Sequence, residues 1–310
     1  MLERSRSLVV AAWATLISQI MIVGTGGAVR LTGSGLGCDS WPNCTPERFV
    51  PTPEMGIHSA IEFGNRVLGG IVVLIALVML VMAIRQRAGR AIVAIAALVF
   101  GITVLQALMG AVVVWMHLRP DTVGLHFILS VALVAKAAVM LWKVQVGPSG
   151  PVTAPGWQRI LVHAMTAALA VVVLIGILTT GSGPHAGDGG AARNGLDPAV
   201  MQHVHAIPAY VLTVLVLGVL AAAAIRGPRR HLLWSAALLA VTVAQAVVGI
   251  VQSNTGLPIL LVGIHMVLSV IATAIAAAVV LSLRPSLRAP LRGPDEADPP
   301  RPAEREAVAA

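Results

Sequence analysis

The chain has 310 residues, of which 57% are hydrophobic and 11% charged, and its formal net charge is +8. Soluble domains carry about 25% charged residues, so this composition excludes an ordinary soluble protein. A basic chain can bind nucleic acid, but here the basic residues lie between apolar segments and form no binding face. We therefore expect a membrane protein whose main partner is the lipid bilayer, with no nucleic acid.

Eight apolar segments follow one another along the chain. Each has about 20 residues or more, enough to cross roughly 30 Å of hydrocarbon as a helix. The expected spanning helices are residues 8–28, 58–84, 91–115, 122–143, 157–179, 200–225, 231–253 and 259–283. The predicted fold class is therefore all-α, with eight transmembrane helices.

Basic residues predict the orientation of these helices. They concentrate in the segments that share a side with the N-terminus, for example at Arg85, Lys143 and Arg229. Cytoplasmic segments carry such an excess, so we expect a multi-pass protein of the plasma membrane with both termini in the cytoplasm. The first apolar segment follows arginines, as a signal peptide does, but no small-residue cleavage site follows it, and we expect it to be retained.

The chain contains an internal repeat. The recurring residues are Gln106, Ala107, Gly110, Val112, Val123, Gly124, His126, Leu129, Ser130 and Val131, which return at one constant spacing as Gln245, Ala246, Gly249, Val251, Val262, Gly263, His265, Leu268, Ser269 and Val270. Four helices return the chain to its starting side, so the two units are predicted to run parallel. We expect four-helix units at 1–145 and 155–283, and a disordered cytoplasmic tail at 284–310.

Four histidines lie near the starts of the even-numbered segments. His58, His126, His205 and His265 all lie within the first turns of the even-numbered segments, which predicts one shared depth. A neutral imidazole is a good ligand for haem iron. His205 and His265 would form a pair, and His126 would supply one ligand in the first unit. A lone histidine at a membrane edge is more often simply solvated, but the repetition favours ligation. His203 is expected to face away from His205.

Glu62 is the only acidic residue inside a predicted span. Burying a carboxylate in a membrane is costly unless it is paired or protonated. Glu62 could form an ion pair with Arg66, one turn further along the helix, or it could donate and accept protons, which we favour. Arg66 is also suited to a haem propionate, which it could hold through two parallel hydrogen bonds.

Cys38 and Cys44 are the only cysteines and share the first outer loop. The redox environment there permits a disulfide. Such a bond could be a structural staple of the glycine-rich loop or an exchangeable redox pair, and the sequence leaves both possibilities open. A CxxC motif is absent, which argues against zinc.

Residues from about 8 to 283 resemble the bacterial haem A synthase family. The resemblance rests on Gly26–Cys38, on Trp41–Cys44, on Ile61-Glu62-Phe63-Gly64-Asn65-Arg66, and on the repeated His126 and His265 segments. It implies an oxidoreductase that converts haem O to haem A for cytochrome oxidase biogenesis, by successive oxygen-dependent hydroxylations that turn one ring methyl into a formyl group.

The resemblance also implies roles for individual residues. His205 and His265 would bind a haem b cofactor, His126 would bind the iron of the substrate haem, and Glu62 would be catalytic. Cys38 and Cys44 would form a disulfide that assists haem handling. The implied partners are haem O, molecular oxygen, an electron donor, haem O synthase (a protohaem farnesyltransferase) and cytochrome oxidase assembly factors. A homo-oligomer is compatible with the sequence.

One position departs from the family pattern. The family has histidine where this chain has Asn65, and an amide is a poor iron ligand. The substrate haem would then be held by His126 alone, or by His58, which lies about 10 Å from Asn65 along the helix axis. An alternative function is a di-haem electron-transfer protein of the quinone-cytochrome b kind, but that function requires two complete histidine pairs.

Overall fold

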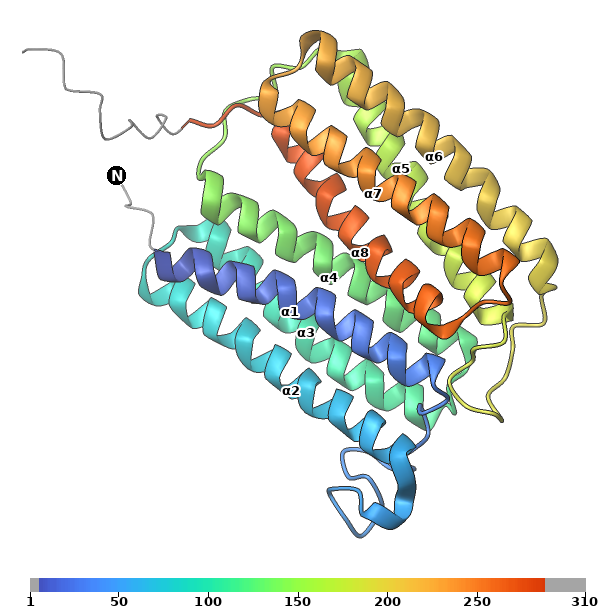
Figure 1. Cartoon of the computed structure of the whole chain (residues 1–310). Coiled ribbons are helices and arrows are strands. Elements are labelled where there is room, and N and C mark those ends of the chain that lie inside the picture. The colour runs from blue at the N-terminus through green and yellow to red at the C-terminus, as the bar shows by residue number, and fades with distance from the viewer. Residues whose placement is uncertain (1–5, 288–310) are drawn as a thin grey trace, which may run out of the picture.

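The computed structural model describes residues 6–287, which form eight long α-helices joined by turns and loops (Figure 1). The helices are α1 (Arg6–Leu31), α2 (Gly56–Arg85), α3 (Arg90–Trp115), α4 (Pro120–Val146), α5 (Gly156–Ser182), α6 (Pro198–Arg226), α7 (Arg229–Asn254) and α8 (Ile259–Ser282). A short 3-10 helix, Pro53–Met55, precedes α2. All eight helices are long and apolar enough to cross a membrane, which confirms the eight predicted spans.

Local chemistry sets where several helices begin. α4 and α6 start at Pro120 and Pro198, because proline suits the first helical turn, where its missing N–H has no helical partner. The Asp197 carboxylate caps α6 by accepting hydrogen bonds from the N–H groups of Ala199 at 2.8 Å and Val200 at 3.1 Å. These first turns lie before the apolar runs, so both helices start earlier than hydrophobicity alone predicts.

The helices pack as two groups of four. In the first group α1 contacts α2 and α4, and α3 lies against both α2 and α4; in the second, α5 contacts α6 and α8, and α7 lies against both α6 and α8. Each group has its own apolar core, with Met79 and Met140 fully buried in the first and Met165 and Leu238 in the second. α8 joins the groups by packing on α1 and α4 (Figure 1). The two-fold relation between the units stays a prediction.

Large apolar side chains cover the outside of the bundle. Leu74 is 58% exposed, Val214 67% and Ile250 61%. A helix at the surface of a soluble protein presents polar residues to the solvent, whereas a lipid-facing helix presents residues such as these. The exposed surface therefore agrees with the helix lengths, and the protein is a multi-pass membrane protein.

The bundle has two distinct ends. The loop end carries the loops at 32–55 and 183–197, and the linker end carries the start of α1, the linker at 147–155 and residues 284–287 (Figure 1). At the linker end, Gly150 N–H donates to the Pro285 carbonyl at 2.9 Å and Leu287 N–H to the Pro148 carbonyl at 3.1 Å. Residues 285–287 of the predicted disordered tail thus pair with the linker, and the remainder, 288–310, lies outside the described residues.

Candidate functional site

Two histidines from different helices meet in the second helix group. His205 lies about two turns into α6 and His265 about two turns into α8. Their ring centroids are 6.3 Å apart, with an interplanar angle of 72°. Two imidazoles whose nitrogens each lie about 2 Å from one first-row metal ion have their rings at a similar separation. The fold thus brings the predicted ligand pair together.

Glycines on the two neighbouring helices allow these rings to sit close to the backbone. A Cβ added to Gly176 of α5 would lie 3.0 Å from Cε1 of His205, and one added to Gly249 of α7 would lie 3.3 Å from Cε1 of His265. Both Nδ1 atoms are buried without a hydrogen-bond partner. Because buried polar atoms are nearly always paired, the unpaired nitrogens indicate rings arranged for a bound group.

The donor set around this pair suits a haem. Within residues 6–287, no group of three or more His, Cys, Asp or Glu side chains could hold a metal ion. A metal between His205 and His265 would therefore take its other ligands from a cofactor, and a haem supplies its own ring of nitrogens and accepts histidine as an axial ligand. The residues present fit a haem with two histidine ligands.

The first helix group offers a single imidazole of this kind. His126 lies about two turns into α4, and its Nδ1 is also buried without a partner. Its carbonyl oxygen accepts hydrogen bonds from Gln106 Nε2 at 3.1 Å and from Ser130 Oγ at 3.0 Å. Asn65 stands at the repeat position of the ligand on α6, and its Oδ1 accepts a hydrogen bond from Thr25 Oγ1 at 2.8 Å.

His58 lies apart from the other three histidines. It is in the first turn of α2, whereas the other three lie about two turns into their helices. The shared depth of the four histidines stays a prediction. The side chain of His58 is exposed, and its Nδ1 lies 2.8 Å from the hydroxyl oxygen of Ser34, just beyond α1. To act as the alternative ligand of the substrate haem while it keeps this contact, His58 would have to bind the iron through Nε2.

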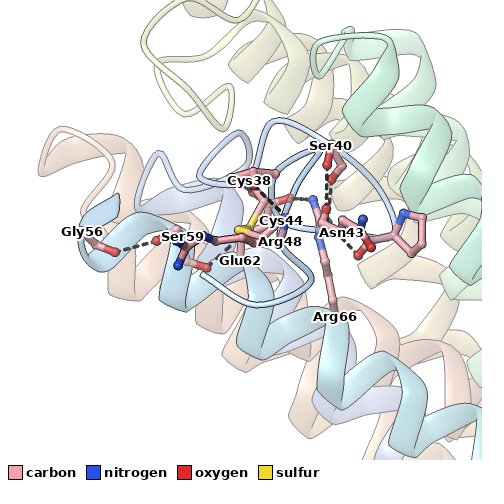
Figure 2. The surroundings of a disulfide bond; sticks show 11 residues. Cys38, Ser40, Asn43, Cys44, Arg48, Gly56, Ser59, Glu62 and Arg66 are labelled. Carbon is pink, nitrogen blue, oxygen red and sulfur yellow. Dashed lines mark hydrogen bonds and ion pairs between the residues drawn. A yellow bond between two sulfur atoms is a disulfide. The ribbon is translucent and has the colours of Figure 1, made fainter. Parts of the chain in front are cut away.

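Glu62 lies in the second turn of α2, against the disulfide-bonded loop (Figure 2). Its residue is only 5% exposed. Oε1 forms an ion pair with Arg66 Nη2 at 2.6 Å, and Oε2 accepts a hydrogen bond from the N–H of Cys38 at 2.7 Å. The ion pair that the sequence left as one alternative is therefore formed. A carboxylate has about four lone-pair positions, so the two contacts leave it able to accept a further hydrogen bond.

Arg66 connects this carboxylate to the loop. Its Nη1 donates to the carbonyl oxygens of Ser40 at 2.7 Å and Asn43 at 3.0 Å (Figure 2). A propionate contact, which we predicted for Arg66, would have to use its remaining N–H donors and stays a prediction. In the structure, Arg66 positions Glu62 and holds the loop.

Cys38 and Cys44 form a disulfide bond, and both residues are fully buried. Thiol–disulfide exchange requires a thiolate to reach one of the sulfur atoms. Burial therefore favours the structural staple over the exchangeable pair. Edge-to-face ring contacts between Trp41 and Trp115 and between Phe49 and Phe63 join the same loop to α3 and α2.

Sequence reasoning missed a contact between the two helix groups at the loop end. Arg30, in the last turn of α1, donates to the carbonyl oxygens of His185 at 2.9 Å and Thr180 at 3.2 Å. Nearby, Gly35 N–H donates to the Gly187 carbonyl at 2.8 Å. The acceptors are backbone carbonyls, which no residue pattern marks, so only the arginine at the helix end could have suggested this contact.

The fold and the site together define a multi-pass membrane protein with a histidine pair suited to a haem. The family model COX15-CtaA, described as cytochrome oxidase assembly protein, matches residues 9–280. The chain belongs to this family.

Individual relatives carry a more specific name. Heme A synthases of Bacillus cereus (strain AH187), Bacillus anthracis (strain A0248) and Bacillus thuringiensis subsp. konkukian (strain 97-27) are each 35% identical to this chain over 134 residues. The matched segment covers 42% of this chain and 42% of each relative, which is less than half the length of these curated relatives. The relatives do not favour the electron-transfer alternative.

The close approach of the loop to α2 gives a testable prediction. A Cβ on Gly37 would lie 2.6 Å from the backbone nitrogen of Ser59 and would also overlap the His58 carbonyl. Gly37→Ala should push the loop away from α2 and lower the melting temperature by about 2–10 °C, measured by thermal unfolding of the purified protein. Gly101→Ala is the control, because a Cβ at this helical position meets no atom within 4 Å. Equal melting temperatures for the two variants would contradict this packing.

Proposed function

We propose that this protein is a haem A synthase, an oxidoreductase of the plasma membrane. It would convert the ring methyl of haem O to the formyl group of haem A by successive oxygen-dependent hydroxylations. The observation that carries the proposal is the inequality of the two helix groups. One has a complete histidine pair, His205 and His265, and the other has His126 with Asn65 in place of a second histidine. An enzyme that acts on one haem with the help of another requires such unlike pockets.

The second unit, residues 155–283, would hold the cofactor. His205 and His265 would be the axial ligands of a haem b, and their unpaired, buried Nδ1 atoms support this role. A haem whose two axial positions are both filled by histidine supplies one-electron transfer. The close packing of Gly176 and Gly249 against the imidazole rings would keep both side chains in place.

The first unit, residues 1–145, would receive the substrate haem, with His126 as the ligand of its iron. Asn65 and His58 would contribute to this pocket, with Nδ1 of His58 close to the Ser34 hydroxyl. Each oxygen-dependent hydroxylation consumes protons as well as electrons, and Glu62 is the acidic group on α2 that could transfer them. We assign Arg66 the role of orienting Glu62, because its ion pair and loop contacts fix the carboxylate.

The proposal includes the partners that this chemistry requires. These are haem O, molecular oxygen and an electron donor, together with haem O synthase, which would deliver the substrate, and cytochrome oxidase assembly factors, which would receive the product. The termini would lie in the cytoplasm, which places the Cys38–Cys44 loop on the outer side of the membrane.

Glu62→Ala tests the catalytic role of the carboxylate. In a strain that lacks its own haem A synthase, the variant should retain its haem b and form about 100-fold less haem A than the wild type, measured by chromatography of extracted haems. Glu54→Ala is the matched control, since Glu54 is an exposed acidic residue at the same end of the bundle, and it should keep wild-type haem A levels. Haem A formation by Glu62→Ala at the control level would rule out this role.

His265→Ala tests the cofactor site. Removal of one of two axial ligands should abolish the low-spin haem b absorption of the purified protein. His203→Ala is the control, because His203 is exposed and its Nδ1 lies 2.8 Å from the Ala199 carbonyl of its own helix. A low-spin haem b signal that survives in His265→Ala as it does in His203→Ala would contradict the ligand assignment.

A further inference from the structure

A hydrogen-bonded triangle joins α3 to α4 at His126. The Gln106 side-chain amide donates from Nε2 to the carbonyl oxygen of His126 at 3.1 Å and to the hydroxyl oxygen of Ser130. The Ser130 hydroxyl in turn donates to the same His126 carbonyl at 3.0 Å. Both amide protons of Gln106 therefore have acceptors on α4.

This triangle fixes which way the Gln106 amide points. The His126 carbonyl can only accept hydrogen bonds, and the Ser130 proton is already directed to it, so the NH2 group must face α4. If the amide were rotated by half a turn, Oε1 of Gln106 would face the carbonyl oxygen of His126, and two acceptors would meet. Oε1 of Gln106 consequently faces away from these partners, and it is buried without any hydrogen-bond donor.

Space for a ligand lies on the same face of α3. Gly110 is one turn from Gln106 toward the loop end, and a Cβ added there would meet no atom within 4 Å. Its repeat counterpart, Gly249, is closed by the ring of His265, 3.3 Å from such a Cβ. The space beside Gly110 in the first helix group is therefore empty, whereas the imidazole of His265 fills the corresponding space beside Gly249 in the second.

The triangle is also confined to the first group. Gln245 is the repeat counterpart of Gln106, and its Oε1 is also buried without a partner. Its side chain forms no hydrogen bond with any residue of 6–287, so no contact of this kind orients its amide. Ser269, the counterpart of Ser130, donates to the Met266 carbonyl of its own helix at 2.7 Å. The sequence repeats these residues, but only the first unit uses them to orient an amide beside the single histidine.

We infer that Gln106 is a substrate-binding residue whose Oε1 accepts a hydrogen bond from a hydroxyl group of the haem bound in the first unit. This inference rests on the proposed function. A ring methyl cannot donate a hydrogen bond, but the hydroxymethyl group that the first hydroxylation creates can donate one. Gln106 thus retains the hydroxylated intermediate until its second oxidation. Haem O also carries a hydroxyl on its farnesyl side chain, which offers the same chemistry before the reaction begins.

The test is the haem composition of Gln106→Leu, which keeps most of the side-chain volume and removes the acceptor. The ratio of hydroxymethyl intermediate to haem A should rise about 3- to 10-fold, the effect of one lost hydrogen bond, while the amount of bound haem O stays at the wild-type level. Less bound haem O with an unchanged ratio would show that Oε1 binds the farnesyl-chain hydroxyl, which would overturn the assignment to the intermediate. An unchanged ratio and unchanged haem O binding would overturn the inference entirely.

Two further variants separate substrate binding from a structural role. Gln245→Leu should keep the wild-type product ratio, and so should Ser130→Ala, which weakens the link between α3 and α4 while Gln106 still bonds to the His126 carbonyl. If Ser130→Ala raises the ratio as much as Gln106→Leu does, the link between the helices sets the ratio and the inference is wrong. Failure of the wild type to form haem A in the same assay would instead reject the proposed function.

Discussion

The buried carboxylate of Glu62 is the constraint on which the loop end of the first helix group depends. A carboxylate with so little exposure requires a counter-charge and hydrogen-bond donors, because its lost hydration is otherwise uncompensated. Arg66 provides the charge, and Cys38 N–H provides a donor from the loop. Arg66 also donates to the carbonyls of Ser40 and Asn43. The helix, the loop and the disulfide therefore form one unit, and a change in the charge of Glu62 would affect all three.

The two helix groups differ most in how much room they leave beside their histidines. In the second group, Gly176 and Gly249 bring helix backbones against both imidazole rings. In the first group, Gly110 faces open space and the amide of Gln106 presents a buried oxygen without a partner. A tightly enclosed pair suits a resident cofactor, which stays bound. A more open pocket with an unused acceptor suits a substrate that enters, changes and leaves.

Much of the fold could be predicted from the sequence, because apolar runs of sufficient length form helices in a membrane almost regardless of their detail. The pairing of His205 with His265 was predictable from the repeat, which places both histidines near the starts of helices that run in the same direction. The hydrogen bonds that Arg66 and Arg30 donate to backbone carbonyls could not be predicted. Arg66 donates to carbonyls of an irregular loop, and Arg30 donates to one loop carbonyl and to one in the last turn of α5. The direction of a loop backbone is not encoded in residue type.

The most direct test of the account is the haem content of the purified wild-type protein. Two unlike pockets predict one haem b per chain, held by two histidines, together with haem O or haem A in the second position. Haem b alone at two per chain, with no haem O or haem A when haem O is available in the cell, would show two equivalent electron-transfer sites and would contradict the central claim.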